Sequence, residues 1–228
     1  MSLKDEIVPY LDQYGLVQPR LNTGSNNGVL YLSEYFVILN RLGQATLVDQ
    51  MNYKAIIESC FKVPGLLMRN PINAGGQEAP DDNFGVASAA SFLQDKSLAQ
   101  DTLTYGYKHY GAFNNVDGTW TDQAFLWRQL QLYSAYVWAA GKTPLFPFRF
   151  YTAMVILYAS LPTPTSNTDA RALAWLLIQV AAPKSWMCRM AAKLWKRRLF
   201  KDYLNGMTDV AVMQFGADHP LAKYWPEY

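Results

Sequence analysis

The chain has 228 residues and a mass of 25.8 kDa. Half of its residues are hydrophobic and only 17% are charged, and this composition excludes an intrinsically disordered protein. Its formal net charge of +2 is too small to indicate nucleic acid binding by itself. Its two cysteines, Cys60 and Cys188, lie far apart, which excludes a disulfide framework and argues against a structural zinc site. We expect a soluble cytoplasmic protein, because the sequence shows neither a signal-peptide pattern nor an uninterrupted apolar run of membrane-spanning length.

Apolar residues recur at helical spacing along most of the chain. This spacing predicts helices over residues 3–14, 29–42, 47–61, 84–95, 98–110, 121–140, 146–160 and 185–204, and a further one that begins at a capping box at 166–169. The segment 146–160 is apolar almost all round. The alternation typical of strands is almost absent. We therefore predict an all-α fold, a single domain over residues 1–228 with about nine or ten helices packed as antiparallel hairpins.

Three irregular segments, at residues 17–28, 63–83 and 113–120, are longer than simple connections between helices. Long ordered loops in helical domains are often binding or catalytic elements. If consecutive helices are antiparallel, alternate loops lie at the same end of the array. We therefore expect residues in and beside these segments to form any functional site.

Acidic residues beside these segments are the main candidates for catalysis. Glu34 lies one turn into its predicted helix, and Asp81 and Asp82 precede the helix predicted to begin at Phe84. A pair of carboxylates with aromatic residues nearby suits glycoside hydrolysis, in which one acid protonates the leaving oxygen and the other acts as base or nucleophile. Tyr35 and Trp120 are the candidate sugar platforms. The alternative is that the acids are helix-start anions.

The segment CRMAAKLWKRRLFKDYL is the most basic part of the chain. Helical spacing places Ala192 and Trp195 on its inner side and the charges on its outer arc, which comprises Arg189, Lys193, Lys196, Arg197, Arg198 and Lys201. This arc is either a solvated helix face or a surface that binds an acidic partner protein, a nucleic acid or an anionic envelope polymer. Nucleic acid is the less favoured partner, because no aromatic residues are interleaved with the charges.

No cofactor is expected, because the sequence has neither a P-loop nor a dinucleotide-binding fingerprint. No metal site is expected either, because His109 and His219 lack metal-ligand spacing with each other and with the cysteines.

Part of the chain resembles a known group of proteins. The order LYLSEYFVIL, then a cysteine before VPGLLMRNP, then a glutamine before PDDNFG, resembles tailed-bacteriophage proteins of unsettled function whose helices are arranged as in α/α-toroid, six-hairpin glycosidase-like proteins. The resemblance covers about residues 20–95. It implies an incomplete toroid, because a complete one has twelve helices. It also implies a mouth of the array formed by Glu34, Cys60, Pro64, Gly65, Arg69, Asn70, Pro71, Asp81 and Asp82, with Arg69 and Asn70 as substrate-binding residues.

Two hypotheses follow from the residues and the resemblance. The first is a phage-encoded structural or interaction protein, made in the host cytoplasm and associated with the virion, which docks to other virion proteins or to itself. The second is a carbohydrate-active protein that binds or cleaves a bacterial envelope polysaccharide with Glu34, Asp81 and Asp82. The sequence alone does not decide whether the protein is an enzyme.

Overall fold

The structure is a computed structural model that describes residues 2–21, 27–72, 80–111, 113, 126–159, 168–202, 212 and 214–225. For residues 80, 126–128, 159, 168–171 and 196–202 only the backbone is described. Most of the described residues are α-helical, so the predicted all-α fold is confirmed.

The described helices are α1 (Leu3–Ile7), α2 (Gly28–Arg41), α3 (Leu47–Ser59), α4 (Pro80–Ala90), α5 (Ser97–Lys108), α6 (Leu126–Ala139), α7 (Phe146–Ala159), α8 (Thr168–Ala181), α9 (Trp186–Asp202) and α11 (Pro220–Lys223). The first nine described helices, α1 to α9, follow the predicted order with most bounds within a few residues, and α11 was not predicted. The helix predicted over 3–14 is wrong beyond residue 10. A 3₁₀ turn at Val8–Tyr10 follows α1, and Leu11 then pairs with Val17 in a short bridge. Pro9 explains the early end, because its ring and missing N–H disfavour a continuing helix.

A short hairpin lies where the sequence predicted only an irregular segment. Strand β1 (Phe61–Val63) pairs antiparallel with β2 (Leu66–Leu67). Gly65 turns the chain with a φ of +88°, and a Cβ at this position would lie 2.2 Å from the backbone oxygen of Asp101 in α5. The strands are too short to show alternation in the sequence, and close packing on α5 holds the turn in place.

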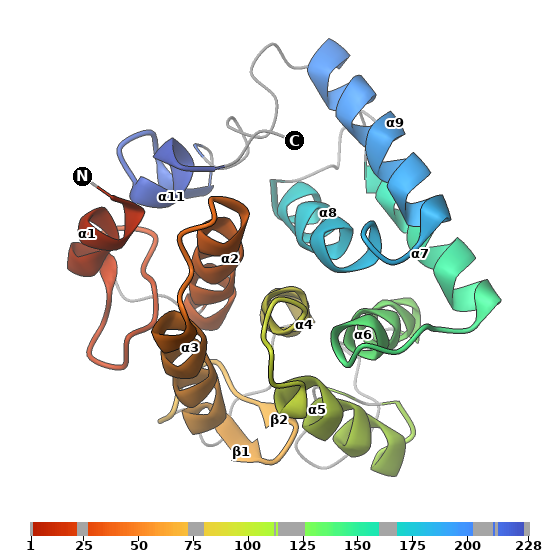
Figure 1. Ribbon diagram of the computed structural model, residues 1–228, viewed down its shortest axis with the longest axis horizontal. Helices are drawn as coiled ribbons and strands as arrows, with labels where there is room; N and C mark the ends of the chain where they lie inside the picture. Colours follow the sequence, from red (N-terminus) through yellow and green to blue (C-terminus); the bar gives the residue numbers. More distant parts are fainter. Residues whose placement is uncertain are drawn as a thin grey trace.

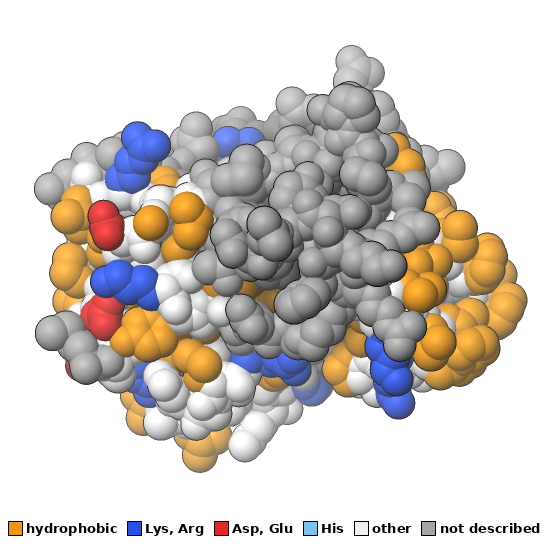
Figure 2. Space-filling model, turned by 90° about the horizontal axis from the view of Figure 1, so that it is seen from above, with side chains coloured by type: hydrophobic (Ala, Val, Ile, Leu, Met, Phe, Trp, Pro, Cys, Tyr) orange, Lys and Arg blue, Asp and Glu red, His pale blue; other side chains and the backbone are white. Residues whose placement is uncertain are grey.

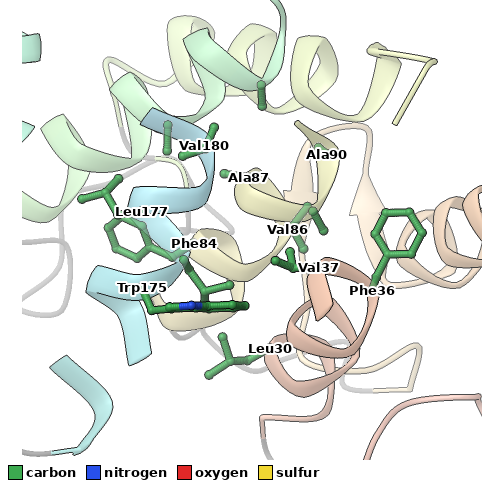
Figure 3. Close-up of a cluster of buried hydrophobic side chains, with 14 of the residues drawn as sticks. Leu30, Phe36, Val37, Phe84, Val86, Ala87, Ala90, Trp175, Leu177 and Val180 are labelled. Atoms are coloured by element: carbon green, nitrogen blue, oxygen red, sulfur yellow. The ribbon is translucent and has the colours of Figure 1, made fainter. Parts of the chain in front are cut away.

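Helix α4 lies in the middle of the molecule and is seen end-on in Figure 1, with α2, α6 and α8 around it. It packs against all three, so it occupies the centre of the array rather than a place in a ring. Figure 3 shows the resulting core, in which Phe84 of α4 meets Trp175 of α8 and Val86 meets Val37 of α2. These side chains are 4% exposed or less.

Two lysines bind carbonyl groups at the C-terminal ends of α4 and α6. The ammonium of Lys96 donates to the carbonyls of Ala90 (3.3 Å) and Ser91 (3.2 Å), where α4 ends. The ammonium of Lys184 donates to the carbonyl of Trp138, where α6 ends. Burial lowers the pKa of Lys184, and the nearby charge of Lys96 lowers it further. The carbonyls at the C-terminal ends of α4 and α6 are therefore each capped by a cation.

Candidate functional site

Two of the acidic side chains predicted to carry chemistry lie in the interior, on neighbouring helices. Glu34 of α2 and Asp82 of α4 are both 0% exposed. Glu34 follows Leu30 by four residues, so it lies on the side of α2 that packs against α4. Gly85 allows the two helices to approach closely, since a Cβ there would be 3.0 Å from the Cβ of Ser33. The structure therefore brings both acids to one helix–helix interface.

Asp82 caps a helix other than its own. Its Oδ1 accepts a hydrogen bond of 2.9 Å from the backbone N–H of Leu30, the third residue of α2. The N–H groups of a first helical turn have no partner within the helix, and the side chain of the N-cap residue Asn27 does not supply one. Asp82 lies in the first turn of α4, which begins at Pro80 and so earlier than predicted. The expected helix-start anion is therefore present, and it accepts a hydrogen bond from the neighbouring helix.

Other polar side chains of α4 also bind across helices. The hydroxyl of Tyr136 donates to Oδ1 of Asn83 at 2.8 Å and links α6 to α4. The hydroxyl of Ser88 donates to the carbonyl of Leu176 at 3.0 Å and links α4 to α8. Asp81 is partly buried in the same turn as Asp82. Within the described part of the chain, no group of three His, Cys, Asp or Glu residues is arranged to hold a metal ion.

The residues predicted to bind a sugar lie in different surroundings. Tyr35 is half-buried, and burial, together with the charge of Asp49 at the start of α3, raises its pKa to about 12. Arg69 and Asn70 are partly buried after β2, and Oδ1 of Asn70 accepts the backbone N–H two residues later at 3.0 Å, which makes it a turn residue. Trp120 lies outside the described residues.

The predicted basic arc belongs to α9, of which the side chains are described as far as Trp195. Arg189 and Lys193 are exposed, and Ala192 and Trp195 are buried on the inner side. The guanidinium of Arg189 donates to the carbonyls of residues 182 and 183 at 3.3 Å each, so it caps the end of α8. The remaining positively charged residues of the arc belong to the part of α9 whose side chains lie outside the description, namely Lys196, Arg197, Arg198 and Lys201.

A large exposed apolar surface covers α7 and α9, and the sequence reasoning missed it. We call it the α7–α9 face, and its side chains are Leu145 (68% exposed), Phe146 (59%), Phe150 (53%), Met154 (47%), Tyr158 (65%), Trp186 (70%), Met190 (50%) and Leu194 (44%). In Figure 2 apolar side chains gather at the right-hand end of the molecule, where Figure 1 places α7 and α9, with lysine or arginine side chains beside them. Apart from Leu145, these residues recur every four positions along each helix, and this spacing in the sequence could have predicted the face.

The exposed stripe of α7 is hard to recognise in the sequence, because α7 is apolar on its inner side as well, where Ala153 and Ile156 are buried. A helix that is apolar all round is normally a buried core helix or a membrane span. Among the residues that the structure describes, no helix has both the length and the apolar character needed to cross a membrane. The outer side of α7 is exposed, with Phe146, Phe150, Met154 and Tyr158 between 47% and 65%.

Comparisons with protein-family models, curated proteins and solved structures find no match for this chain. Its function therefore has to be inferred from its own residues.

Proposed function

We propose that this protein is a structural or interaction component that works by attachment through the α7–α9 face rather than by catalysis. The observation that carries the proposal is the exposure of eight large apolar side chains, seven of them on two neighbouring helices and Leu145 directly before α7. The resemblance to tailed-phage proteins suggests a virion or assembly component. Its attachment partner is then another virion protein, a second copy of the chain or the envelope of the host.

The size of the face supports attachment. A large aromatic side chain has about 150–250 Å² of surface, so eight large side chains that are roughly half exposed present on the order of 800 Å². The largest apolar patch of a typical monomer is about 300–600 Å². One side of a stable protein interface buries about 800 Å². The α7–α9 face is therefore larger than an incidental patch and large enough to form an interface.

The interior acids support the same conclusion. Asp82 caps α2, and both Asp82 and Glu34 are fully buried between two helices in tight contact. A catalytic pair for a polysaccharide would need to reach a glycosidic bond from two sides. Full burial therefore counts against catalysis by this pair. Carbohydrate chemistry stays the second proposal, and the observation that favours it is the proximity of the two acids at one helix–helix interface.

The first experiment uses two matched pairs of substitutions. Phe150→Ser with Met154→Ser makes the α7–α9 face polar, and Leu47→Ser with Met51→Ser alters side chains on α3 that are 59% and 71% exposed. In a phage that encodes the chain, we expect the first pair to remove the protein from purified particles or from its assembly complex, and the control pair to leave it there. Equal incorporation of both variants would contradict the attachment function.

The second experiment addresses catalysis. The purified protein is incubated with bacterial envelope polysaccharide, and released reducing ends are measured for the unchanged chain and for Glu34→Gln. The attachment function predicts no release by either protein. Release by the unchanged chain that disappears in a Glu34→Gln variant of unchanged melting temperature would establish the carbohydrate-active alternative.

A further inference from the structure

The outer side of α7 presents an apolar surface. The exposed side chains Phe146, Phe150, Met154 and Tyr158 follow one another at intervals of four residues over almost the whole helix. The single charged residue of α7 is Arg149, which is half-buried with its guanidinium 5.8 Å from the centre of the Phe146 ring. An apolar band therefore runs along α7.

Helix α9 extends this band sideways. The thiol of Cys188 lies 3.8 Å from the carbonyl oxygen of Arg149, which places the start of α9 beside the start of α7. The two helices pack along their length and run in the same direction in Figure 1. The stripe formed by Trp186, Met190 and Leu194 therefore runs beside the stripe of α7.

The segment that carries the band is rich in positive charge and poor in acids. Between residues 141 and 201 the sequence holds ten lysine and arginine residues and one acid, Asp169. Arg189 and Lys193 are exposed on α9 next to its apolar stripe, and α9 continues through KRR at 196–198. A second copy docked by the same face would bring like charges together, which disfavours that occupant. The charge pattern requires a partner that is both apolar and anionic.

A membrane surface with anionic headgroups has both properties. Helices that lie in the membrane interface carry tryptophan, phenylalanine and leucine on one side and lysine and arginine around them, and they need not be long enough to span. The α7–α9 face has this composition, and it forms a rounded end of the molecule in Figure 2 rather than a groove for a partner helix. We infer that the α7–α9 face binds an anionic lipid surface, with its apolar side chains at the headgroup level and its cations on the lipid phosphates.

This inference rests on the proposed attachment function and names the partner of the same face. Its test is flotation of the purified full-length chain with vesicles of phosphatidylcholine and phosphatidylglycerol, compared with vesicles of phosphatidylcholine alone. We expect flotation with the anionic vesicles and affinity at least about tenfold lower for the neutral ones, because Lys193 is exposed beside the apolar stripe and each lysine or arginine near an anionic surface contributes about 1 kcal/mol. High salt should weaken binding to the anionic vesicles.

Substituted variants distinguish vesicle binding by the α7–α9 face from nonspecific binding to vesicles. Phe150→Ser with Met154→Ser should abolish flotation, Lys193→Glu should weaken it on anionic vesicles, and the α3 control pair Leu47→Ser with Met51→Ser should float like the unchanged chain. All variants should keep the far-UV circular dichroism spectrum and melting temperature of the unchanged chain, because the altered side chains are exposed.

Three outcomes overturn the inference. The first is that the unchanged chain does not float with anionic vesicles. The second is that the polar variant floats as well as the unchanged chain. The third is a dimer in sedimentation that dissociates in the polar variant and does not bind vesicles. If vesicles are not bound but the polar variant still leaves the phage particle, the attachment function stands and the lipid partner is wrong. If the polar variant has neither effect, both proposals fail.

Discussion

The cross-helix cap gives the most discriminating prediction about the buried acids. Replacing Asp82 by Asn keeps the shape and the Oδ1 acceptor but removes the charge that strengthens the hydrogen bond from Leu30. A hydrogen bond to a charged acceptor contributes about 1.5–3 kcal/mol and one between neutral groups about 0.5–1.5 kcal/mol. We therefore expect Asp82→Asn to lower the free energy of unfolding by about 1–2 kcal/mol.

Replacing Asp82 by Ala should cost more. The N–H of Leu30 then has no acceptor from this side chain, in a residue that is 4% exposed. A buried unsatisfied donor costs about 1–3 kcal/mol, in addition to the lost packing of the carboxylate. The expected order of stability is the unchanged chain, then Asp82→Asn, then Asp82→Ala. For a chain of this length each kcal/mol lowers the melting temperature by about 2–4 °C.

Equilibrium unfolding in urea measures these differences in the free energy of unfolding. Unfolding is followed by circular dichroism at about 222 nm, near the minimum of the helical spectrum. Asp95→Asn is the control, because its carboxylate is 54% exposed and pairs with Lys54 at the surface, where ion pairs contribute little. An Asp82→Asn variant that is more stable than the unchanged chain would refute the cap. That result would mean that the carboxylate is held in the interior at a cost to stability, as catalytic groups often are.

Two further predictions concern the chain ends and the hairpin. Burial lowers the pKa of His219, and a hydrogen bond to the carbonyl of Gln18 only partly opposes this effect. As the pH falls, the histidine of the unfolded chain is therefore protonated before that of the folded chain. The free energy of unfolding should then decrease as the pH drops below about 6.5. Thermal melts across this range should show the effect, and His219→Gln should reduce it; an identical pH dependence would contradict the assignment. Gly65→Ala should lower the free energy of unfolding by about 3 kcal/mol or more, because the new Cβ clashes with the backbone of Asp101 and the residue is strained at a positive φ. Gly43→Ala is the control. Gly43 has a φ of +68° but no neighbour within 4 Å, so this substitution should lower the free energy of unfolding by about 1 kcal/mol. Equal losses in urea unfolding would count against the close packing of the hairpin on α5.

The all-α fold could be predicted because its signals are local. Apolar spacing and stop residues act within one or two turns, so the bounds predicted for the second helix, 29–42, differ from α2 (Gly28–Arg41) by one residue at each end. The hairpin around Gly65 could not be predicted in this way. Its strands are two and three residues long, and its turn depends on the backbone of Asp101, which lies far along the chain.

The candidate site depended on tertiary structure to a greater extent. The sequence by itself determined that Asp82 is an acid at a helix start, which is a property of its immediate neighbours. Only the packing of α2 against α4 decided that its hydrogen-bond donor is Leu30. In the same way, the four-residue spacing of Phe150 and Met154 is visible in the sequence, but whether such a stripe is covered depends on which helices pack over it. Apolar spacing determines that a helix has an apolar side, and tertiary packing decides whether that side is buried or left for a partner.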